Sequence, residues 1–202
     1  MQSPIIITIT GPGASGKSTL CGQVVEKNPQ LFQTIGIDHY WLDHSTLNED
    51  ELRAHNLDQP SAYDTPLLTK HIHEFLNQTP FKPPEICFSR RSTTTSSQII
   101  TPDKILLLEG TMAGAIPACV EHSKLVVFID APLDICLCRR LLRKRSRRHD
   151  TIEPTIQKYL RHIRPGYLKY IASSKETADL ILTGMDHEAD YKKLITQIEQ
   201  LQ

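Results

Sequence analysis

Short, almost entirely apolar runs alternate with segments of helical periodicity along the 202 residues of the chain. The apolar runs predict strands at IIITIT (5–10), TIGI (34–37), KILLLEG (104–110), KLVVFID (124–130) and ADLILTG (178–184). Helical spacing predicts helices over 17–27, 65–78, 133–145, 155–163 with a continuation, and 188–201. Strands that are apolar throughout are usually buried on both faces. The pattern therefore predicts an α/β fold, with a mostly parallel sheet flanked by helices on both faces.

Two polar stretches interrupt the alternation. Segment 43–64 has no regular period, and an irregular insert of that length is often a substrate-binding element. The segments EICFS (85–89) and STTTSSQII (92–100) are expected to pair as a small hairpin. The length of the chain fits one domain over 1–202, in which 43–64 and 85–100 are substrate-binding inserts.

The segment GPGASGKST (11–19) lies between the first predicted strand and the first predicted helix. It fits the P-loop pattern G-x-x-x-x-G-K-S/T in the strand–loop–helix context that the pattern requires. Glycines let successive backbone N–H groups curl around an anion, and the helix directs the positive end of its dipole at the same point. A lysine then contacts the β- and γ-phosphates, and a hydroxyl binds Mg²⁺. The predicted nucleotide-binding residues of this P-loop NTPase fold are Gly11, Gly13, Ala14, Ser15, Gly16, Lys17, Ser18 and Thr19.

Three carboxylates, Asp38, Glu109 and Asp130, each stand at the end of a predicted strand. Ligands of an open parallel sheet bind at the carboxyl ends of its strands, so we expect these acids to converge beside the phosphates. Mg²⁺ takes one or two carboxylates besides phosphate oxygens and waters, and a carboxylate near the acceptor favours phosphoryl transfer to a hydroxyl. A strand-end acid can also simply cap a turn. That role fits Asp130 equally well, because Pro132 begins a helix two residues later.

The segment RRLLRKRSRRH (139–149) is strongly basic, with Arg or Lys at seven of the ten residues 139–148. Such a run can be a solvated helix face or a nucleic-acid patch. A formal net charge of zero and a position directly after a core strand argue against nucleic acid. We predict a lid over 143–151, in which Arg143 and Arg147 fold over the triphosphate and stabilise the transferring group.

Composition excludes several other classes. Hydrophobic residues make up 39% and charged residues 23% of the chain, which is typical of a soluble globular protein. No apolar run approaches the roughly 20 residues that cross a bilayer, and MQSPIIITIT lacks the features of a signal peptide. The five cysteines include no C-x-x-C pair, as expected of thiols in a reducing compartment. We expect a cytoplasmic protein with no nucleic-acid or membrane partner; homo-oligomer formation is left open.

The motifs together resemble the uridine kinase family of P-loop nucleoside kinases, within the phosphoribulokinase/uridine kinase superfamily. GPGASGKST is similar to that family's phosphate loop, and IDHYW resembles its aspartate–x–aromatic–tyrosine motif. NLDQPSAYD (56–64) resembles its asparagine–aromatic–aspartate–x–proline–x–alanine–aromatic–aspartate motif. LEG, FIDAPLDICLCRRLLR, YLRHIRPGYLKYI and ADLILTG match its later segments in the same order, so the resemblance spans 5–184.

The resemblance implies ATP and Mg²⁺ as cofactors and a nucleoside-like acceptor. Asp38 would be the catalytic, acceptor-activating aspartate, acting with Lys17, and Glu109 would join Ser18 at the magnesium site. Asp58 and Arg140 would contact the ribose. The substrate-binding residues implied in this way are Asp38, Tyr40, Asp58, Phe88, Arg91, Arg140 and Lys158.

The chain departs from the family in the part that grips the base. The family has a tyrosine–aspartate–phenylalanine motif followed by a histidine, whereas this chain has EICFSRRS. Phe88 can take the place of the phenylalanine, but Ile86 replaces the tyrosine and Arg91 falls near the histidine. Lys158 replaces a glutamine near the base, and the lid segment SRRHD lacks the usual glycine. The resemblance thus covers phosphate transfer fully and base recognition only in part.

We therefore expect ATP-dependent phosphoryl transfer to the 5′-hydroxyl of a ribonucleoside. Within the kinase class, the alternatives are another small alcohol: nicotinamide riboside, pantothenate or a sugar phosphate. Outside it, the alternative is a degenerate kinase that only binds nucleotide as a regulator, against which the retained Asp38 and Glu109 argue. A GTPase is disfavoured because the chain has no guanine-reading N-K-x-D segment.

Overall fold

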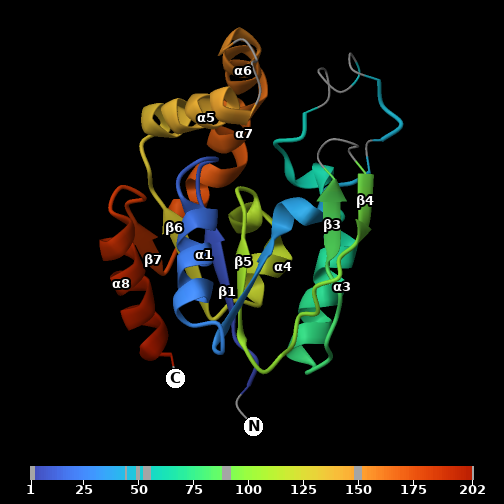
Figure 1. Cartoon of the computed structure of the whole chain (residues 1–202), viewed down its shortest axis with the longest axis vertical. Coiled ribbons are helices and arrows are strands. Elements are labelled where there is room, and N and C mark those ends of the chain that lie inside the picture. Colours follow the sequence, from blue (N-terminus) through green and yellow to red (C-terminus); the bar gives the residue numbers. More distant parts are fainter. Residues whose placement is uncertain are drawn as a thin grey trace.

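The computed structural model describes residues 3–43, 45–48, 51, 56–87, 92–147 and 152–201, without the side chains of 144–147. Its centre is a five-stranded parallel sheet in the order β2-β5-β1-β6-β7 (Figure 1). The strands are β1 (Ile6–Thr10), β2 (Phe32–Gly36), β5 (Ile105–Glu109), β6 (Leu125–Ile129) and β7 (Leu180–Leu182). The predicted α/β class with a parallel sheet is confirmed.

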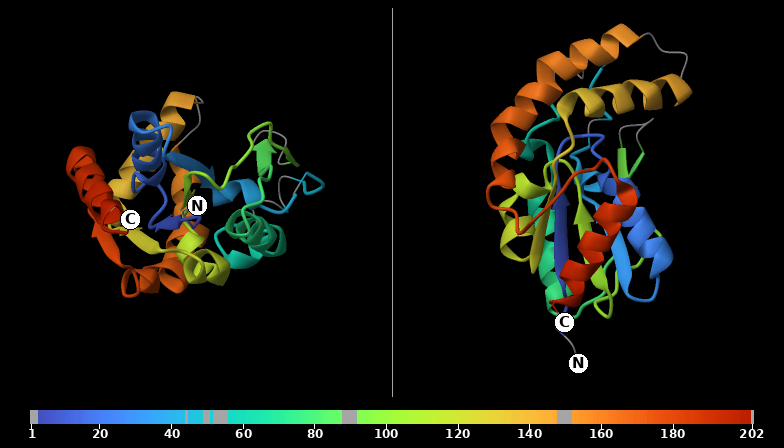
Figure 2. Two further views of the ribbon diagram at one scale, coloured as in Figure 1. Left: turned by 90° about the horizontal axis from the view of Figure 1, so that it is seen from below. Right: turned by 90° about the vertical axis from the view of Figure 1, so that its left-hand side faces the viewer.

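Helices cover both faces of this sheet (Figure 2). Side chains of β1 alternate between the two faces, as the period of two along a strand requires. Ile7 and Ile9 pack with α1 (Lys17–Lys27) and α8 (His187–Glu199), and Ile6 packs on the opposite side with α3 (Thr65–Leu76) and α4 (Pro117–Glu121). Both clusters are buried, which explains why most residues of the strands are apolar on both faces.

A continuous helical segment, residues 152–175, completes the second face and rises beyond the sheet (Figure 2). It contains α6 (Ile152–Lys158) and α7 (Arg164–Gly166), joined and followed by π-helical turns at Tyr159–Ile163 and Tyr167–Ile171. Helix α5 (Leu133–Arg147) lies across the carboxyl end of the sheet (Figure 1). No helix in the described part of the chain is long and apolar enough to cross a membrane.

The predicted hairpin forms beside the main sheet. Strands β3 (Pro84–Cys87) and β4 (Ser92–Thr95) pair antiparallel, while residues 88–91 lie outside the described part of the chain. The Thr93 hydroxyl donates to the carbonyl of Trp41 at 3.2 Å, and the Ile86 amide donates to Nδ1 of His39 at 3.4 Å. These bonds hold the hairpin next to the short 3₁₀ turn Ile37–Tyr40 that follows β2.

Candidate active site

The phosphate loop leaves β1 through backbone conformations that require glycine. Gly11 has φ 137° and Gly16 has φ 109°, a region that side chains with a Cβ rarely adopt. A Cβ on Gly11 would also lie 2.5 Å from the carbonyl oxygen of Ile129 in β6. Ala14 has φ 74°, so a residue between the two glycines is also left-handed. The loop is therefore tightly curved and leads directly into the first turn of α1. The free N–H groups of that turn point toward the space enclosed by the loop.

Lys17 is folded back over this loop. Its Nζ donates to the carbonyl oxygens of Gly11 at 3.0 Å and Pro12 at 2.8 Å, and the residue is only 6% exposed. Burial lowers the pKa of the ammonium, whereas the nearby Glu109 and Asp38 carboxylates raise it. The positive charge is thus held inside the curve of the loop, where an anion would bind.

Two carboxylates share this space with Lys17, and we call the three the charged cluster. Glu109 ends β5 and accepts a hydrogen bond from the Ser18 hydroxyl at 2.8 Å. Asp38 lies in the 3₁₀ turn that follows β2. Burial raises the pKa of both carboxyls, and the Lys17 ammonium lowers it in both. The strand ends therefore bring together the two acids and the lysine as the topology predicts.

Asp130 does not join the charged cluster, so the expectation of three converging acids is wrong for this residue. Its carboxylate is 2.6 Å from Nζ of Lys175, in an ion pair at the surface. Its amide donates to the carbonyl of Leu182 at 2.7 Å, which continues the pairing of β6 with β7. Asp130 therefore pairs with the end of the helical segment and not with the charged cluster.

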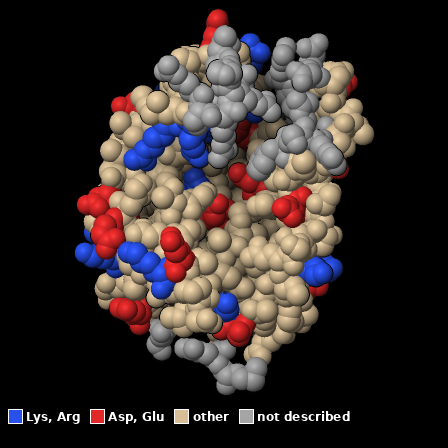
Figure 3. Space-filling model, in the orientation of Figure 1, with Lys and Arg blue, Asp and Glu red and all other residues tan. Residues whose placement is uncertain are grey.

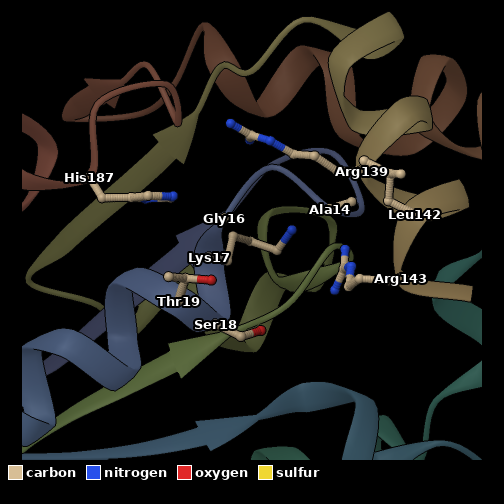
Figure 4. A pocket seen from close by; sticks show the side chains of 9 residues that line it. All are labelled: Ala14, Gly16, Lys17, Ser18, Thr19, Arg139, Leu142, Arg143 and His187. Atoms are coloured by element: carbon tan, nitrogen blue, oxygen red, sulfur yellow. The ribbon is translucent and has the colours of Figure 1, made fainter. Parts of the chain in front are cut away.

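A cleft of about 300 Å³ opens above the phosphate loop (Figure 4). Its floor is the loop and the start of α1, one wall is α5, and the other is the start of α8. In the space-filling view, basic side chains follow the upper rim of a hollow and acidic side chains lie within it (Figure 3). The residues that line the cleft are Ala14, Gly16, Lys17, Ser18, Thr19, Arg139, Leu142, Arg143 and His187.

Arg139, which the sequence does not single out from the other arginines of its run, links three parts of this cleft. From α5, its guanidinium donates to the carbonyl oxygens of Ser15 at 3.3 Å and Gly184 at 2.9 Å. Gly184 has φ 65°, and a Cβ there would lie 2.4 Å from the carbonyl oxygen of Ser15. The turn between β7 and α8 is thus pressed against the phosphate loop, which brings His187 to the cleft.

A second group of predicted residues lies on the other side of the loop. Asp58 is half-buried, and burial raises the pKa of its carboxyl while Lys158 and Arg140 lower it. Arg140 lies against the loop itself, since a Cβ on Gly13 would be 2.5 Å from its Nη2. Asp58 is also packed closely on the helical segment, because a Cβ on Gly166 would lie 2.4 Å from its carbonyl oxygen. The structure thus brings Asp58, Arg140 and Lys158 near one another.

Tyr40 is the predicted substrate contact that the structure places elsewhere. It is 1% exposed, and its hydroxyl lies 2.9 Å from Nδ1 of His71 on α3, within the apolar core. Three further predicted contacts cannot be located. Phe88 and Arg91 lie outside the described residues, and Arg147 is described only in its backbone; the predicted lid 143–151 also extends beyond the described part of α5.

A phosphate loop at the end of a central parallel strand, beneath a basic helix and beside two half-buried acids, defines the class of P-loop kinases. The sequence profile of the Phosphoribulokinase / Uridine kinase family matches residues 6–189. The chain belongs to this family.

Individual relatives agree with the family match. A uridine kinase of Alkaliphilus metalliredigens is 32% identical over 203 residues, which cover 100% of this chain and 98% of the relative. A uridine kinase of Shewanella piezotolerans is 34% identical over 183 residues, covering 88% and 86%. Among solved structures, the phosphoribulokinase of Rhodobacter spheroides has the same fold, with a TM-score of 0.62 at 13% identity, covering 92% of this chain and 74% of that one.

Proposed function

We propose that this kinase transfers the γ-phosphoryl group of ATP to the 5′-hydroxyl of a ribonucleoside, with uridine as the first candidate. The observation that carries the proposal is the position of Asp38, which shares the charged cluster with Lys17 at the mouth of the phosphate loop. Asp58 and Arg140, on the far side of the loop, supply a carboxylate and a guanidinium for sugar hydroxyls. The relatives named as uridine kinases support this choice of acceptor.

In this mechanism, the protein supplies alignment and electrostatic stabilisation, since phosphoryl transfer asks little covalent chemistry of it. Asp38 accepts the proton of the attacking hydroxyl and directs its oxygen at the γ-phosphorus. Lys17 exchanges its contacts with the Gly11 and Pro12 carbonyls for phosphate oxygens. Arg143, on the wall of the cleft, neutralises charge that spreads onto the transferring group.

Ser18 and Glu109 fit a magnesium site. Their side-chain oxygens lie 2.8 Å apart beside the phosphate loop, and both are hard donors of the kind that Mg²⁺ prefers. Among the described residues, no three His, Cys, Asp or Glu side chains gather into a metal site of their own. This is consistent with Mg²⁺, which usually completes its coordination with phosphate oxygens and waters. Bound there, the ion would neutralise charge on the β- and γ-phosphates.

The remaining parts of the chain are assigned accordingly. We propose a single kinase domain over 1–202, with 43–64 and 85–100 as acceptor-binding inserts and 143–151 as the lid. The hairpin contacts to His39 and Trp41 support this assignment, because they hold β3 and β4 next to the turn that carries Asp38. A cytoplasmic location fits an enzyme that uses ATP. The resemblance assigns Phe88 and Arg91, which lie outside the described residues, to recognition of the base.

Glu109→Gln should raise the Mg²⁺ concentration needed for half-maximal activity about tenfold or more, because an amide oxygen carries no charge for the ion. The initial rate of the variant should rise when the Mg²⁺ concentration is increased. Titration of the initial rate with MgCl₂ at saturating ATP measures this shift. As a control, Glu188→Gln removes an exposed carboxylate that pairs with Lys27 and should leave the Mg²⁺ requirement unchanged. A wild-type Mg²⁺ requirement in Glu109→Gln would remove this residue from the metal site.

The acceptor should be a ribonucleoside rather than a deoxyribonucleoside. Asp58 provides a carboxylate in a partly desolvated site, and such a site rejects ligands that lack the partner hydroxyl. We expect kcat/KM for 2′-deoxyuridine to be at least about 100-fold below that for uridine. Ile86, Arg91 and Lys158 offer no acceptor for a base amine, so uridine should also exceed cytidine. Initial rates with uridine, cytidine, 2′-deoxyuridine and nicotinamide riboside at saturating ATP and Mg²⁺ test these statements.

Each result in this panel has a distinct consequence. Equal kcat/KM for uridine and 2′-deoxyuridine would take Asp58 out of the ribose site. Equal kcat/KM for uridine and cytidine would refute the argument that the base site offers hydrogen-bond donors but no acceptor for a base amine. If ATP binds and none of the four nucleosides is phosphorylated, the nucleoside proposal fails, and pantothenate and sugar phosphates become the acceptors to test.

A further inference from the structure

The hydroxyl of Tyr63 donates a hydrogen bond to Oδ1 of Asp38, with 3.1 Å between the two oxygens. Tyr63 is 5% exposed, so the donor of this partly buried bond is shielded from bulk water. Burial and the nearby Asp38 carboxylate raise the pKa of the Tyr63 hydroxyl well above its ordinary value. The phenol therefore stays protonated, and remains a donor, over the whole pH range in which a kinase would be assayed.

The surrounding backbone fixes this contact from two sides. The amide of Leu42 donates to the carbonyl of Ala62 at 3.0 Å, and Trp41 pairs with Tyr63 in an isolated antiparallel bridge. The indole of Trp41 also meets the ring of Tyr63 edge-on, with 6.1 Å between ring centroids. These contacts tie the segment before α3 to the turn after β2 and hold the backbone of Tyr63 next to the turn that carries Asp38.

Tyr40 belongs to the same turn as Asp38 but points the other way. Its hydroxyl bonds to His71 on α3 and not to the charged cluster. The wall behind Asp38 therefore contains two buried tyrosine hydroxyls, one on the carboxylate and one on a core histidine. This difference makes the two tyrosines a matched pair for experiment.

A carboxylate that takes a proton from a substrate hydroxyl needs one oxygen free and correctly aimed. Catalytic bases are commonly oriented by a third group that bonds to the atom not used in proton transfer. Tyr63 occupies Oδ1 of Asp38, which leaves Oδ2 for the acceptor. We propose that Tyr63 is a positioning residue that orients Asp38 for proton abstraction from the acceptor hydroxyl. This inference rests on the proposed role of Asp38 as the base.

The groups around Asp38 determine how the pKa of this carboxyl should change when the Tyr63 hydroxyl is removed. Burial raises the pKa of this carboxyl; the Lys17 ammonium and the Tyr63 hydrogen bond lower it. Tyr63 acts without adding a charge, so its hydroxyl can be removed while every charged neighbour is kept. Loss of the hydroxyl should raise the pKa of Asp38, because the ionised form loses a donor. The charged and titratable groups that face Asp38 besides Tyr63 are Lys17, His39, Asp58 and Glu109.

The test is Tyr63→Phe, which keeps the ring and removes the hydroxyl. We expect kcat for acceptor phosphorylation to fall about tenfold, the size of effect expected for one hydrogen bond to a charged group. The acid limb of the pH–kcat profile should move to higher pH, and KM for ATP should stay at the wild-type value. Tyr40→Phe is the matched control: it removes a buried hydroxyl of the same wall and should leave the acid limb in place. ATP binding and a thermal denaturation curve establish that each variant is folded.

A wild-type kcat and acid limb in Tyr63→Phe would overturn the inference. So would equal losses in Tyr63→Phe and Tyr40→Phe without a pH shift, since Tyr63 would then only contribute to packing. In an Asp38→Asn background, Tyr63→Phe should cause no further loss of rate, because no base remains to be oriented. If Asp38→Asn alone keeps the wild-type rate, the proposed function of Asp38 fails; if it is inactive and Tyr63→Phe is normal, only the role of Tyr63 fails.

Discussion

Lys17→Ala should lower kcat by about three orders of magnitude and leave a folded protein. The ammonium sits within the curve of the phosphate loop and has Glu109 and Asp38 as its charged neighbours. Its removal takes away the cation that the transferring phosphoryl group needs, an effect comparable with the loss of other such groups in phosphoryl transfer. Burial lowers the pKa of this amine, so its positive charge opposes folding, and removing the charge should leave the protein folded. Steady-state rates and thermal denaturation measure the two quantities separately.

Lys27→Ala is the matched control for that prediction. Lys27 ends the same helix, α1, but is 41% exposed in its side chain and pairs with Glu188 at the surface. Its turnover should remain close to that of the wild type, because an exposed ion pair contributes little. If Lys17→Ala also turned over near the wild-type rate, the phosphate-loop interpretation of 11–19 would be wrong.

Asp38→Asn should lower transfer to the acceptor by about two to four orders of magnitude, the contribution usual for a positioned general base. The amide keeps the shape of the side chain and can still accept the hydrogen bond from Tyr63. What it loses is the ability to take a proton. ATP affinity should change little, because the loop and Lys17 remain in place. Single-turnover rates and ATP titration, each measured on the same preparation, separate these effects.

The control for Asp38→Asn is Asp130→Asn. Asp130 also ends a strand of the same sheet, but its carboxylate pairs with Lys175 at 2.6 Å. We therefore expect Asp130→Asn to lose only a surface ion pair and to keep a rate of transfer close to that of the wild type. Equal losses in the two variants would mean that Asp38 is no more than another strand-end acid.

The fold could be predicted from the sequence because its strands are mostly apolar on both faces and each is followed by a turn or helix. The errors are at short elements and at the ends of elements, where periodicity carries little information. Helix α4 has five residues and was not predicted, and β7 is shorter than the apolar run that predicted it. The helical segment 152–175 begins three residues earlier than its periodicity indicated.

The site could be predicted where its residues are local or end a strand. The phosphate loop is one continuous segment. Asp38 and Glu109 could be placed beside it because each stands at the end of a predicted strand of the parallel sheet. Arg139 and Tyr63 could not be recognised, because their partners are 124 and 25 residues away in the chain. Tyr40 was assigned to the substrate because IDHYW resembles the family's aspartate–x–aromatic–tyrosine motif, but residues two apart in a 3₁₀ turn point in different directions.

The bonds of Arg139 make the C-terminal end of the chain part of the nucleotide site. One guanidinium connects the phosphate loop to the turn at Gly184, so α5, the loop and the start of α8 hold their positions together. A truncation that removes only β7 and α8 leaves the sequence of the phosphate loop intact. It would nevertheless remove one wall of the cleft above the loop and one hydrogen-bond acceptor of Arg139. A minimal functional unit must therefore include the turn at Gly184 that Arg139 contacts, although this turn is far from 11–19 along the chain.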